Sequence, residues 1–242
     1  MTDNSFAPTS SLAPRVACLL AGLALMPLTF AQSAQTLRAT YEGAFLMGTA
    51  VNKAIVAGEA PKLQQIAIRQ FNSITAENVL KAEEVNPQPG VFDFAAADAF
   101  VEFGEKHEMF IVGHTLIWHN QTPSWFFQDD KGQPNTAEAQ KEVLRRHIEK
   151  VAGRYQGRIH AWDVVNEVID NDGSYRPTTW VKGIGNGDEL VKLAFKYASE
   201  YAPGAELYYN DFNAWRPAKR DGIVRMVKML QAAGIRIDGV GM

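Results

Sequence analysis

The sequence of 242 residues contains one cysteine, Cys18, so it cannot form an internal disulfide or a thiolate metal cluster. Its five histidines are scattered without the spacing of a metal site, and we expect neither a metal nor any other cofactor.

Basic residues do not outnumber acidic ones, since 24 lysines and arginines stand against 27 acidic residues and give a net charge of -3. No basic run of five or more residues occurs, which argues against a nucleic-acid partner. The sequence lacks a serine elbow, a phosphate-binding P-loop and a paired-histidine zinc helix.

Long apolar runs are confined to one segment near the N-terminus. Arg15 precedes fifteen mostly apolar residues, 16–30, and small residues follow around Ala31 and Ala34. This order is typical of a secretory signal, and the run is too short and too interrupted by proline for a membrane span. We therefore predict that residues 1–34 are a signal peptide with a short leader, that cleavage follows Ala31 or Ala34, and that the mature protein is secreted, extracellular or periplasmic, without a membrane partner.

The remaining residues, 35–242, form one expected domain, because 46% of the chain is hydrophobic and the length suffices for a sizeable core. Apolar segments of strand type alternate here with amphipathic segments of helical type. The expected strands are residues 44–52, 72–78, 109–119, 159–167, 205–211 and 235–242, and the expected helices are residues 62–71, 96–107, 137–155, 188–201 and 218–233. Six strand-helix units in roughly 200 residues predict an α/β fold, either an incomplete TIM (β/α)8 barrel with about six of its eight units or a doubly wound sheet.

Polar residues stand at the carboxyl ends of five of the six expected strands. They are Asn52, Glu77 with Asn78, His114 with His119, Asn166 with Glu167, and Asn210 with Asp211. A barrel brings the carboxyl ends of all its parallel strands to one pocket, whereas an open sheet does not. This distribution therefore favours the barrel.

The fourth expected strand, IHAWDVVNE at residues 159–167, carries the strongest chemical signal. Its β-branched and aromatic residues are typical of a buried strand, and its polar residues lie at the carboxyl end. A glutamate at that end, Glu167, enclosed in part by Trp162 or by aromatic residues of neighbouring loops, can serve as a general acid. From these residues alone, the alternative is a solvated glutamate where a strand meets a loop.

Seven segments follow one another along the chain after Thr36: FLMGTAVN, FNSITAENVLK, NPQPGVFDF, GHTLIWHNQTPSWF, WDVVNE, LYYNDFN and DGVG. In this order and spacing they resemble glycoside hydrolase family ten, the retaining endo-β-1,4-xylanases. The resemblance implies an eight-stranded α/β barrel that cleaves internal β-1,4-xylosidic linkages of xylan. Asn-Glu after the fourth strand is shared with other retaining barrel glycosidases, such as cellulases and mannanases, whereas the GHTLIWH and TAENVLK segments favour a xylanase.

The resemblance implies that Glu167 is the general acid/base, which protonates the glycosidic oxygen and later deprotonates water. Asn166 beside it would hydrogen-bond the 2-hydroxyl of the sugar. Strict strand alternation would turn these two consecutive side chains to opposite faces of the sheet. We therefore expect the strand end to depart from regular pleating, for example by a bulge.

Six further positions match residues that bind the glycone side of the substrate in the family: Glu77, Asn78, Lys81, His114, Trp118 and Gln121. For the histidine and the tryptophan, the alternatives are a satisfied core histidine and a packed indole. Phe212 departs from the pattern, because family members often have tyrosine there, and a hydroxyl near the leaving-group side is lost.

No carboxylate in the sequence matches the nucleophile of the family, which lies on the seventh strand, so none is assigned. The sequence ends after the sixth expected strand. We therefore expect an N-terminal fragment of a xylanase that holds the general acid/base but is inactive or nearly so on unactivated xylan, with open sheet edges that promote aggregation. The expected partner is xylan or xylo-oligosaccharide. A non-catalytic carbohydrate-binding protein is the alternative from a different class.

Overall fold

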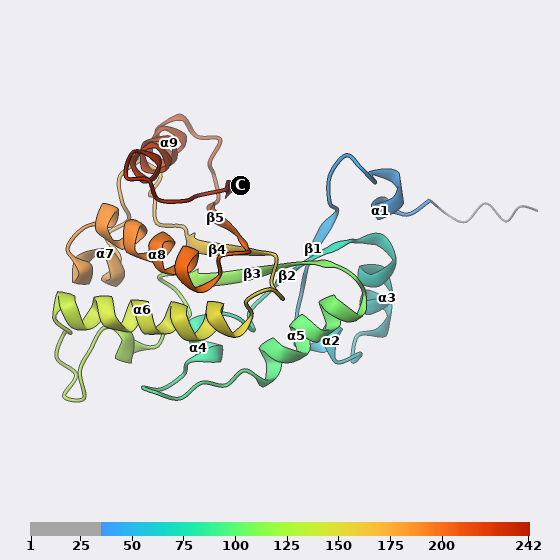
Figure 1. Ribbon diagram of the computed structural model, residues 1–242, viewed down its shortest axis with the longest axis horizontal. Coiled ribbons are helices and arrows are strands. Elements are labelled where there is room, and N and C mark those ends of the chain that lie inside the picture. Colours follow the sequence, from blue (N-terminus) through green and yellow to red (C-terminus); the bar gives the residue numbers. More distant parts are fainter. Residues whose placement is uncertain (1–34) are drawn as a thin grey trace, which may run out of the picture. The chain divides into compact units, whose positions relative to one another are not determined.

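The computed structural model describes residues 35–242, shown in Figure 1. The predicted leader, residues 1–34, and its cleavage sites lie outside the described residues. In chain order the elements are α1 (Leu37–Thr40), β1 (Gly48–Val51), α2 (Lys53–Val56), α3 (Pro61–Gln70), β2 (Ser73–Ala76), α4 (Ala82–Val85), α5 (Ala95–Lys106), β3 (Phe110–Ile117), the 3-10 helix η1 (Ser124–Phe126), α6 (Ala137–Arg154), β4 (Ala161–Asn166), α7 (Thr179–Ile184), α8 (Gly187–Tyr201), β5 (Glu206–Asn210), α9 (Pro217–Ala232) and β6 (Gly239–Gly241).

The strands form one parallel sheet in the order β1-β2-β3-β4-β5-β6, so each strand pairs with the strand that precedes it. Helices lie between consecutive strands because a parallel pair needs a crossover connection. In Figure 1 these helices follow one another around the sheet from α3 through α5 and α6 to α8 and α9. A doubly wound sheet would reverse its strand order at a switch point, and this sheet does not. The predicted barrel arrangement is therefore confirmed over these six strands.

Every strand and long helix expected from the sequence is present, with shifted ends. The first strand is shorter than predicted, since residues 44–47 lie outside β1, and the last is reduced to three residues, β6. Thr136 begins α6 as its N-cap, because its side chain accepts a hydrogen bond from the N–H of Ala139 at 3.2 Å. The short elements α1, α2, α4, α7 and η1 were not predicted, because three to six residues are too few to show a helical period.

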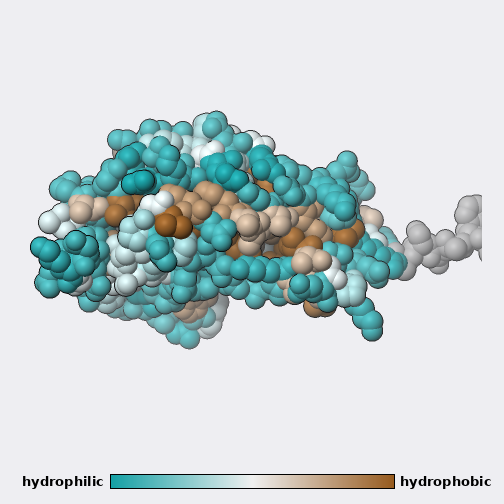
Figure 2. Space-filling model, turned by 90° about the horizontal axis from the view of Figure 1, so that it is seen from below, coloured by the Kyte–Doolittle hydropathy of each residue, from teal (hydrophilic) through white to brown (hydrophobic). Residues whose placement is uncertain are grey.

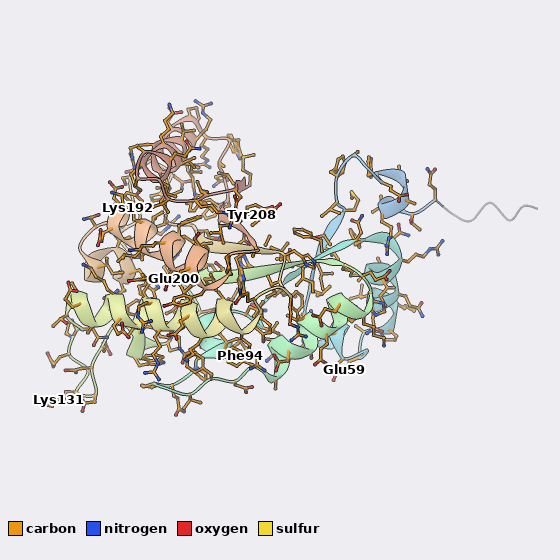
Figure 3. The ribbon with its side chains drawn as sticks, viewed as in Figure 1. Glu59, Phe94, Lys131, Lys192, Glu200 and Tyr208 are labelled. Carbon is orange, nitrogen blue, oxygen red and sulfur yellow. The ribbon has the colours of Figure 1, made fainter. Side chains whose placement is uncertain are left out.

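One face of the sheet is buried under the helices and the other is half-covered. Along β5, Leu207 and Tyr209 are buried while Tyr208 and Asn210 are half-buried, as the alternation of side chains along a strand requires. Figure 3 shows the labelled Tyr208 on one side of the sheet and the labelled Phe94 on the other side, with α5 and α6. The apolar core therefore lies between the sheet and the helices.

The half-covered face of the sheet lines a hollow, which we call the inner hollow. Its volume is about 450 Å³, and its lining comes from strands β1 to β5 and the residues that follow them: Gly48, Thr49, Ala50, Thr75, Ala76, Glu77, His114, Asp163 and Asn210. Most of these residues are small or polar. The inner hollow is thus suited to a polar ligand at the carboxyl ends of the strands.

Hydrophobic side chains also reach the surface of the described unit. Figure 2 shows them in a band between hydrophilic margins on the face seen from below. At the two ends of the strand order, Leu63 and Ile66 of α3 and Val240 of β6 are exposed. Apolar surface of this kind marks a place where further chain or a partner can pack. In the part of the chain that the structure describes, no helix has the length and apolar character needed to cross a membrane.

Candidate active site

The backbone at the end of β4 departs from regular strand geometry. The register with β5 shifts between Asp163 and Val165, where β4 has one residue more than its partner. Glu167, directly after the last strand residue Asn166, has a φ of 57°, in the left-handed region that non-glycine residues adopt rarely. The predicted departure from pleating is therefore confirmed, as a bulge within the strand and a left-handed residue at its end.

Hydrogen bonds hold this unusual backbone on both sides of Glu167. Its N–H donates to the carbonyl oxygen of Asn210 on β5 at 2.9 Å. Its own carbonyl oxygen accepts from Nε of Arg176 at 3.1 Å. Residues held in the left-handed region persist where the surroundings fix them, and such residues cluster at active sites. The side chain of Glu167 therefore extends from a fixed point of the backbone.

The indole of Trp118, from the loop after β3, brings the side chains of Asn166 and Glu167 together. Trp118 Nε1 donates to Glu167 Oε2 at 3.1 Å. With the Asn166 amide oriented so that both its oxygen and its nitrogen have partners, the oxygen lies 3.2 Å from the same Nε1. The two consecutive side chains thus reach one place. Trp162 does not enclose Glu167 in this way, because it is fully buried and packs at Gly113.

Lys81, Asn78, Gln121 and Trp118 form a connected group that we call the recognition cluster. Lys81 Nζ donates to Asn78 Oδ1 at 2.9 Å and to Gln121 Oε1 at 2.8 Å, and Gln121 Nε2 donates to Asn78 Oδ1 at 3.3 Å. The ammonium nitrogen lies 4.7 Å from the centre of the Trp118 ring, within cation–π range. Through the indole, the recognition cluster is joined directly to Glu167.

Burial and two carboxylates act on the pKa of Lys81 in opposite directions. Burial lowers the pKa of its ammonium group below the usual 10.5, while the negative charges of Glu77 and Glu167 oppose this shift. The side chain itself is buried, whereas Glu77 is exposed and Glu167 is half-buried. The recognition cluster thus contains a cation on which the charges of Glu77 and Glu167 both act.

His114 lies in the inner hollow together with Glu77, two residues of the predicted glycone side. Its Nδ1 is 2.8 Å from Oδ2 of Asp163 on the neighbouring strand β4. The histidine has a partner, but it is not enclosed in the core, since it stays half-buried on the open face of the sheet. A carboxylate on Nδ1 fixes the orientation of the ring and leaves Nε2 for another group.

The structure brings six of the eight predicted residues together by direct contacts. They are Asn78, Lys81, Gln121, Trp118, Asn166 and Glu167. It places the other two, Glu77 and His114, in the inner hollow. Arg176 and Asp163 were not singled out from the sequence. Arg176 gave no signal, because it lies on the loop after β4 and reaches Glu167 only when that loop turns back. Asp163 did give one, as a carboxylate within an otherwise apolar strand.

Among residues 35–242, no group of three or more histidine, cysteine, aspartate and glutamate side chains is arranged to hold a metal ion. The arrangement that is present consists of a half-buried carboxyl group, hydrogen-bonded by an indole, beside a set of amide and ammonium donors. A carboxyl group fixed in this way can transfer a proton to or from a ligand that the donors hold.

Comparison with known proteins gives three kinds of match. The sequence profile described as glycosyl hydrolase family 10 matches residues 36–242. The chain is 43% identical to an endo-1,4-beta-xylanase A of Xylanibacter ruminicola, over 91% of this chain and 60% of that protein. It is 44% identical to the solved structure of a family 10 endoxylanase from a sugarcane soil metagenome, with a TM-score of 0.82 over 86% of this chain and 61% of the other.

A third relative is an intracellular xylanase of Thermoanaerobacterium saccharolyticum, solved as a glutamate-to-alanine mutant in complex with xylotriose. It is 34% identical, with a TM-score of 0.82 over 87% of this chain and 67% of that chain. The chain spans about 60% of the length of the Xylanibacter protein and of the metagenome enzyme.

Proposed function

The chain belongs to glycosyl hydrolase family 10, and from this membership we propose that it carries the general acid/base of a retaining endo-1,4-beta-xylanase that cleaves internal linkages of xylan. The observation that carries the proposal is the carboxyl group of Glu167, which is fixed at the end of β4 and accepts from Trp118 Nε1 at 3.1 Å. The relatives reported above are xylanases, which supports this substrate over cellulose or mannan. Family membership also favours an enzyme over a non-catalytic binding protein.

In the proposed mechanism, Glu167 acts twice. It first donates a proton to the glycosidic oxygen as the bond to the leaving sugar breaks, and it then takes a proton from the attacking water. The indole of Trp118 holds the direction of the carboxyl group, and the bonds to Asn210 and Arg176 hold its backbone. Such fixed placement supplies much of the advantage of general acid catalysis over a free acid.

The recognition cluster has donors left over for sugar hydroxyls. An ammonium group has three N–H donors, and Lys81 uses two of them on Asn78 and Gln121. We assign its third donor to a hydroxyl on the glycone side, together with Glu77 and with Nε2 of His114. Asn166 takes the 2-hydroxyl of the sugar at the scissile bond, where its contact strengthens in the transition state.

Retention requires a second carboxylate about 5–5.5 Å from the first, which acts as the nucleophile. Two nearby carboxylates already have other partners, since Asp163 is bound to His114 and Asp211 is paired with Lys219. We assign no nucleophile among residues 35–242 and propose that these residues alone hydrolyse unactivated xylan weakly or not at all. We further propose that the protein is secreted after removal of residues 1–34.

The test compares the hydrolysis of xylan, cellulose derivatives and mannan derivatives by the protein at the length that its gene encodes. We expect reducing ends to appear from soluble xylan well before they appear from cellulose or mannan derivatives. Glu167→Gln should lower the rate on xylan about 100-fold or more, because a positioned proton donor is lost. The control is Glu200→Gln on α8, a charge-neutralising change of the same kind on an exposed helix position.

Equal rates on the three polysaccharides would contradict the choice of xylan. A Glu167→Gln variant that hydrolyses xylan as fast as the Glu200→Gln control would contradict the catalytic assignment. Binding of xylan without hydrolysis by either variant or by the unchanged protein would favour the carbohydrate-binding protein.

A further inference from the structure

Two aromatic side chains are exposed on residues 211–216, which we call the β5–α9 loop. Phe212 is 44% exposed and Trp215 is 74% exposed. A single exposed apolar residue needs no explanation, so the position of the pair decides its meaning. Strand β5 is the direct neighbour of β4 in a parallel sheet, and the loop therefore leaves the sheet at the same edge as Glu167.

Buried contacts hold the β5–α9 loop in place. Asp211 Oδ1 lies 2.6 Å from Lys219 Nζ, and neither side chain is exposed. The N–H of Phe212 donates to Asp211 Oδ1 at 2.8 Å, and Ala214 is buried. A fixed backbone thus presents Trp215 to solvent, so a ligand that packs on the indole loses little free energy to ordering the loop.

The direction of a bound polysaccharide leads to this loop. The recognition cluster comes from residues that follow β2 and β3, on one side of Glu167 in the strand order, and the β5–α9 loop lies on the other side. A chain whose glycone side contacts the cluster and whose scissile bond lies at Glu167 must continue toward β5. Arg176 links the two places, since its Nε bonds the Glu167 carbonyl and its guanidinium carbon lies 5.9 Å from the Phe212 ring centre.

We propose that Trp215 is a stacking platform for a xylosyl unit on the leaving-group side of Glu167, beyond the unit that is released at the bond itself. The proposal rests on the proposed function. The flat apolar face of a sugar ring matches an exposed indole, which offers a large contact area and few rotatable bonds. The guanidinium of Arg216 lies 5.4 Å from the centre of the Trp215 ring, where it restricts the indole and adds donors for sugar hydroxyls.

The test is calorimetric titration of the encoded protein in a Glu167→Gln background, which stops turnover, with xylohexaose and with xylobiose. Trp215→Ala should weaken binding of xylohexaose about 5- to 10-fold, the loss of one aromatic stacking contact, and leave binding of xylobiose nearly unchanged. Trp215→Phe should retain most of the affinity for the longer sugar. The matched control is Phe45→Ala, an aromatic residue that is 57% exposed on the segment before β1.

The outcomes separate the two proposals. If xylohexaose binds and Trp215→Ala does not weaken it more than Phe45→Ala does, the assignment of Trp215 is wrong while the proposed function stands. Equal weakening of both sugars by Trp215→Ala would also overturn the assignment, because it would show an effect on the site as a whole. If neither sugar binds any variant, the proposed function fails and the inference fails with it.

Discussion

At the scale of single residues, the protonation of Lys81 has a consequence that can be measured. Burial lowers the pKa of its ammonium group, and the charges of Glu77 and Glu167 only partly oppose this. The charged form donates to both Asn78 and Gln121 and keeps a third donor for a ligand. The neutral amine has one N–H fewer and no charge, so the site loses its cation when Lys81 deprotonates.

We predict that affinity for xylo-oligosaccharide falls on the alkaline side, beginning below the pH of 10.5 at which an ordinary lysine titrates. The effect on folding has the opposite sign. Between the lowered pKa and 10.5, the unfolded chain holds a proton on Lys81 that the folded chain does not, so this group favours the folded state more as pH rises. As the pH rises, deprotonation of Lys81 should therefore weaken binding of the sugar without lowering the thermal stability of the protein.

Calorimetric titration of xylohexaose across the alkaline range checks this prediction. Lys81→Arg is the matched variant, because a guanidinium keeps its charge throughout the range. The arginine variant should bind xylohexaose as tightly as the unchanged protein or more weakly. Its affinity should not change with pH in the interval where the unchanged protein loses binding. An alkaline loss that persists in the arginine variant would show that another group titrates.

Lys219 and Asp211 form an ion pair with no exposure to solvent, 2.6 Å apart. Lys219→Met would leave the Asp211 carboxylate buried without its cation, and we predict that the free energy of unfolding falls by about 3–5 kcal/mol. The double variant Lys219→Met with Asp211→Asn should recover most of this loss, since no lone charge remains. Urea unfolding at neutral pH measures both.

The control for the buried pair is the next residue of the same helix. Arg220 pairs with Asp221 on an exposed surface, so Arg220→Met should change the free energy of unfolding by about 1 kcal/mol or less. If Lys219→Met and Arg220→Met have equal effects, the buried pair does not stabilise the β5–α9 loop as described.

Sequence motifs were enough to predict that Asn166 and Glu167 stand at the end of the fourth strand, because that position is a local property. The way in which Trp118 joins them was not predictable. It depends on the left-handed backbone of Glu167, which turns two consecutive side chains to one place. Arg176 was missed for a similar reason, since only the return of the loop after β4 brings it to the Glu167 carbonyl.

At the scale of elements, helix α9 supports the loop that carries Arg176. A Cβ atom on Gly222 of α9 would lie 2.4 Å from the carbonyl oxygen of Gly173, and one on Gly173 would lie 2.4 Å from the carbonyl oxygen of Ala218. Glycine is needed at both positions because the two backbones touch, and Gly173 also has a φ of 85°. The loop after β4 therefore packs directly on the helix that follows β5.

We predict that Gly222→Ala lowers the free energy of unfolding by about 1–3 kcal/mol, because the added methyl group overpacks a backbone contact. In an open helix position the same change would stabilise the chain. Gly153 in α6 is such a position, with no atom within 4 Å of an added Cβ, and Gly153→Ala should raise the free energy of unfolding by about 0.5–1 kcal/mol. Thermal and urea unfolding should show that the two substitutions change the free energy of unfolding in opposite directions. Changes in the same direction would contradict the close packing of α9.

The long elements could be predicted from the sequence and the short ones could not. Helices such as α6 and α8 run for four or more turns, so their apolar period is visible. By contrast α4, which follows Lys81, has four residues and no visible period, yet it fixes the place of Lys81 as its first flanking residue. The predicted strand 44–52 is longer than β1 for a different reason, since pairing with β2, not propensity, sets where that strand begins.

At the scale of the whole molecule, residues 35–242 have two sheet edges, because β1 and β6 each pair with one strand only. Exposed apolar residues accompany them, among them Leu63 and Ile66 on α3. An unpaired strand edge with apolar surroundings is a template for association. We therefore predict that residues 35–242, produced alone, self-associate as their concentration rises.

Size-exclusion chromatography with light scattering checks this prediction. Ile66→Lys should reduce self-association, because it replaces exposed apolar surface by charge. The matched control is Gln65→Lys, which adds the same charge to the same helix at an exposed polar position. A concentration-independent monomer, or an equal effect of the two lysines, would contradict an association through this apolar surface.

In the proposed mechanism, Glu167 donates the proton to the leaving group. The direct test of this step is the rate at which the encoded protein and its Glu167→Ala variant cleave aryl xylobiosides whose leaving phenols differ in acidity. An acidic phenol leaves without help, whereas a weakly acidic one needs a proton, so the variant should lose little in the cleavage step with the former and about 100-fold or more with the latter. An equal loss of rate across the series, or no loss, would show that Glu167 is not the proton donor.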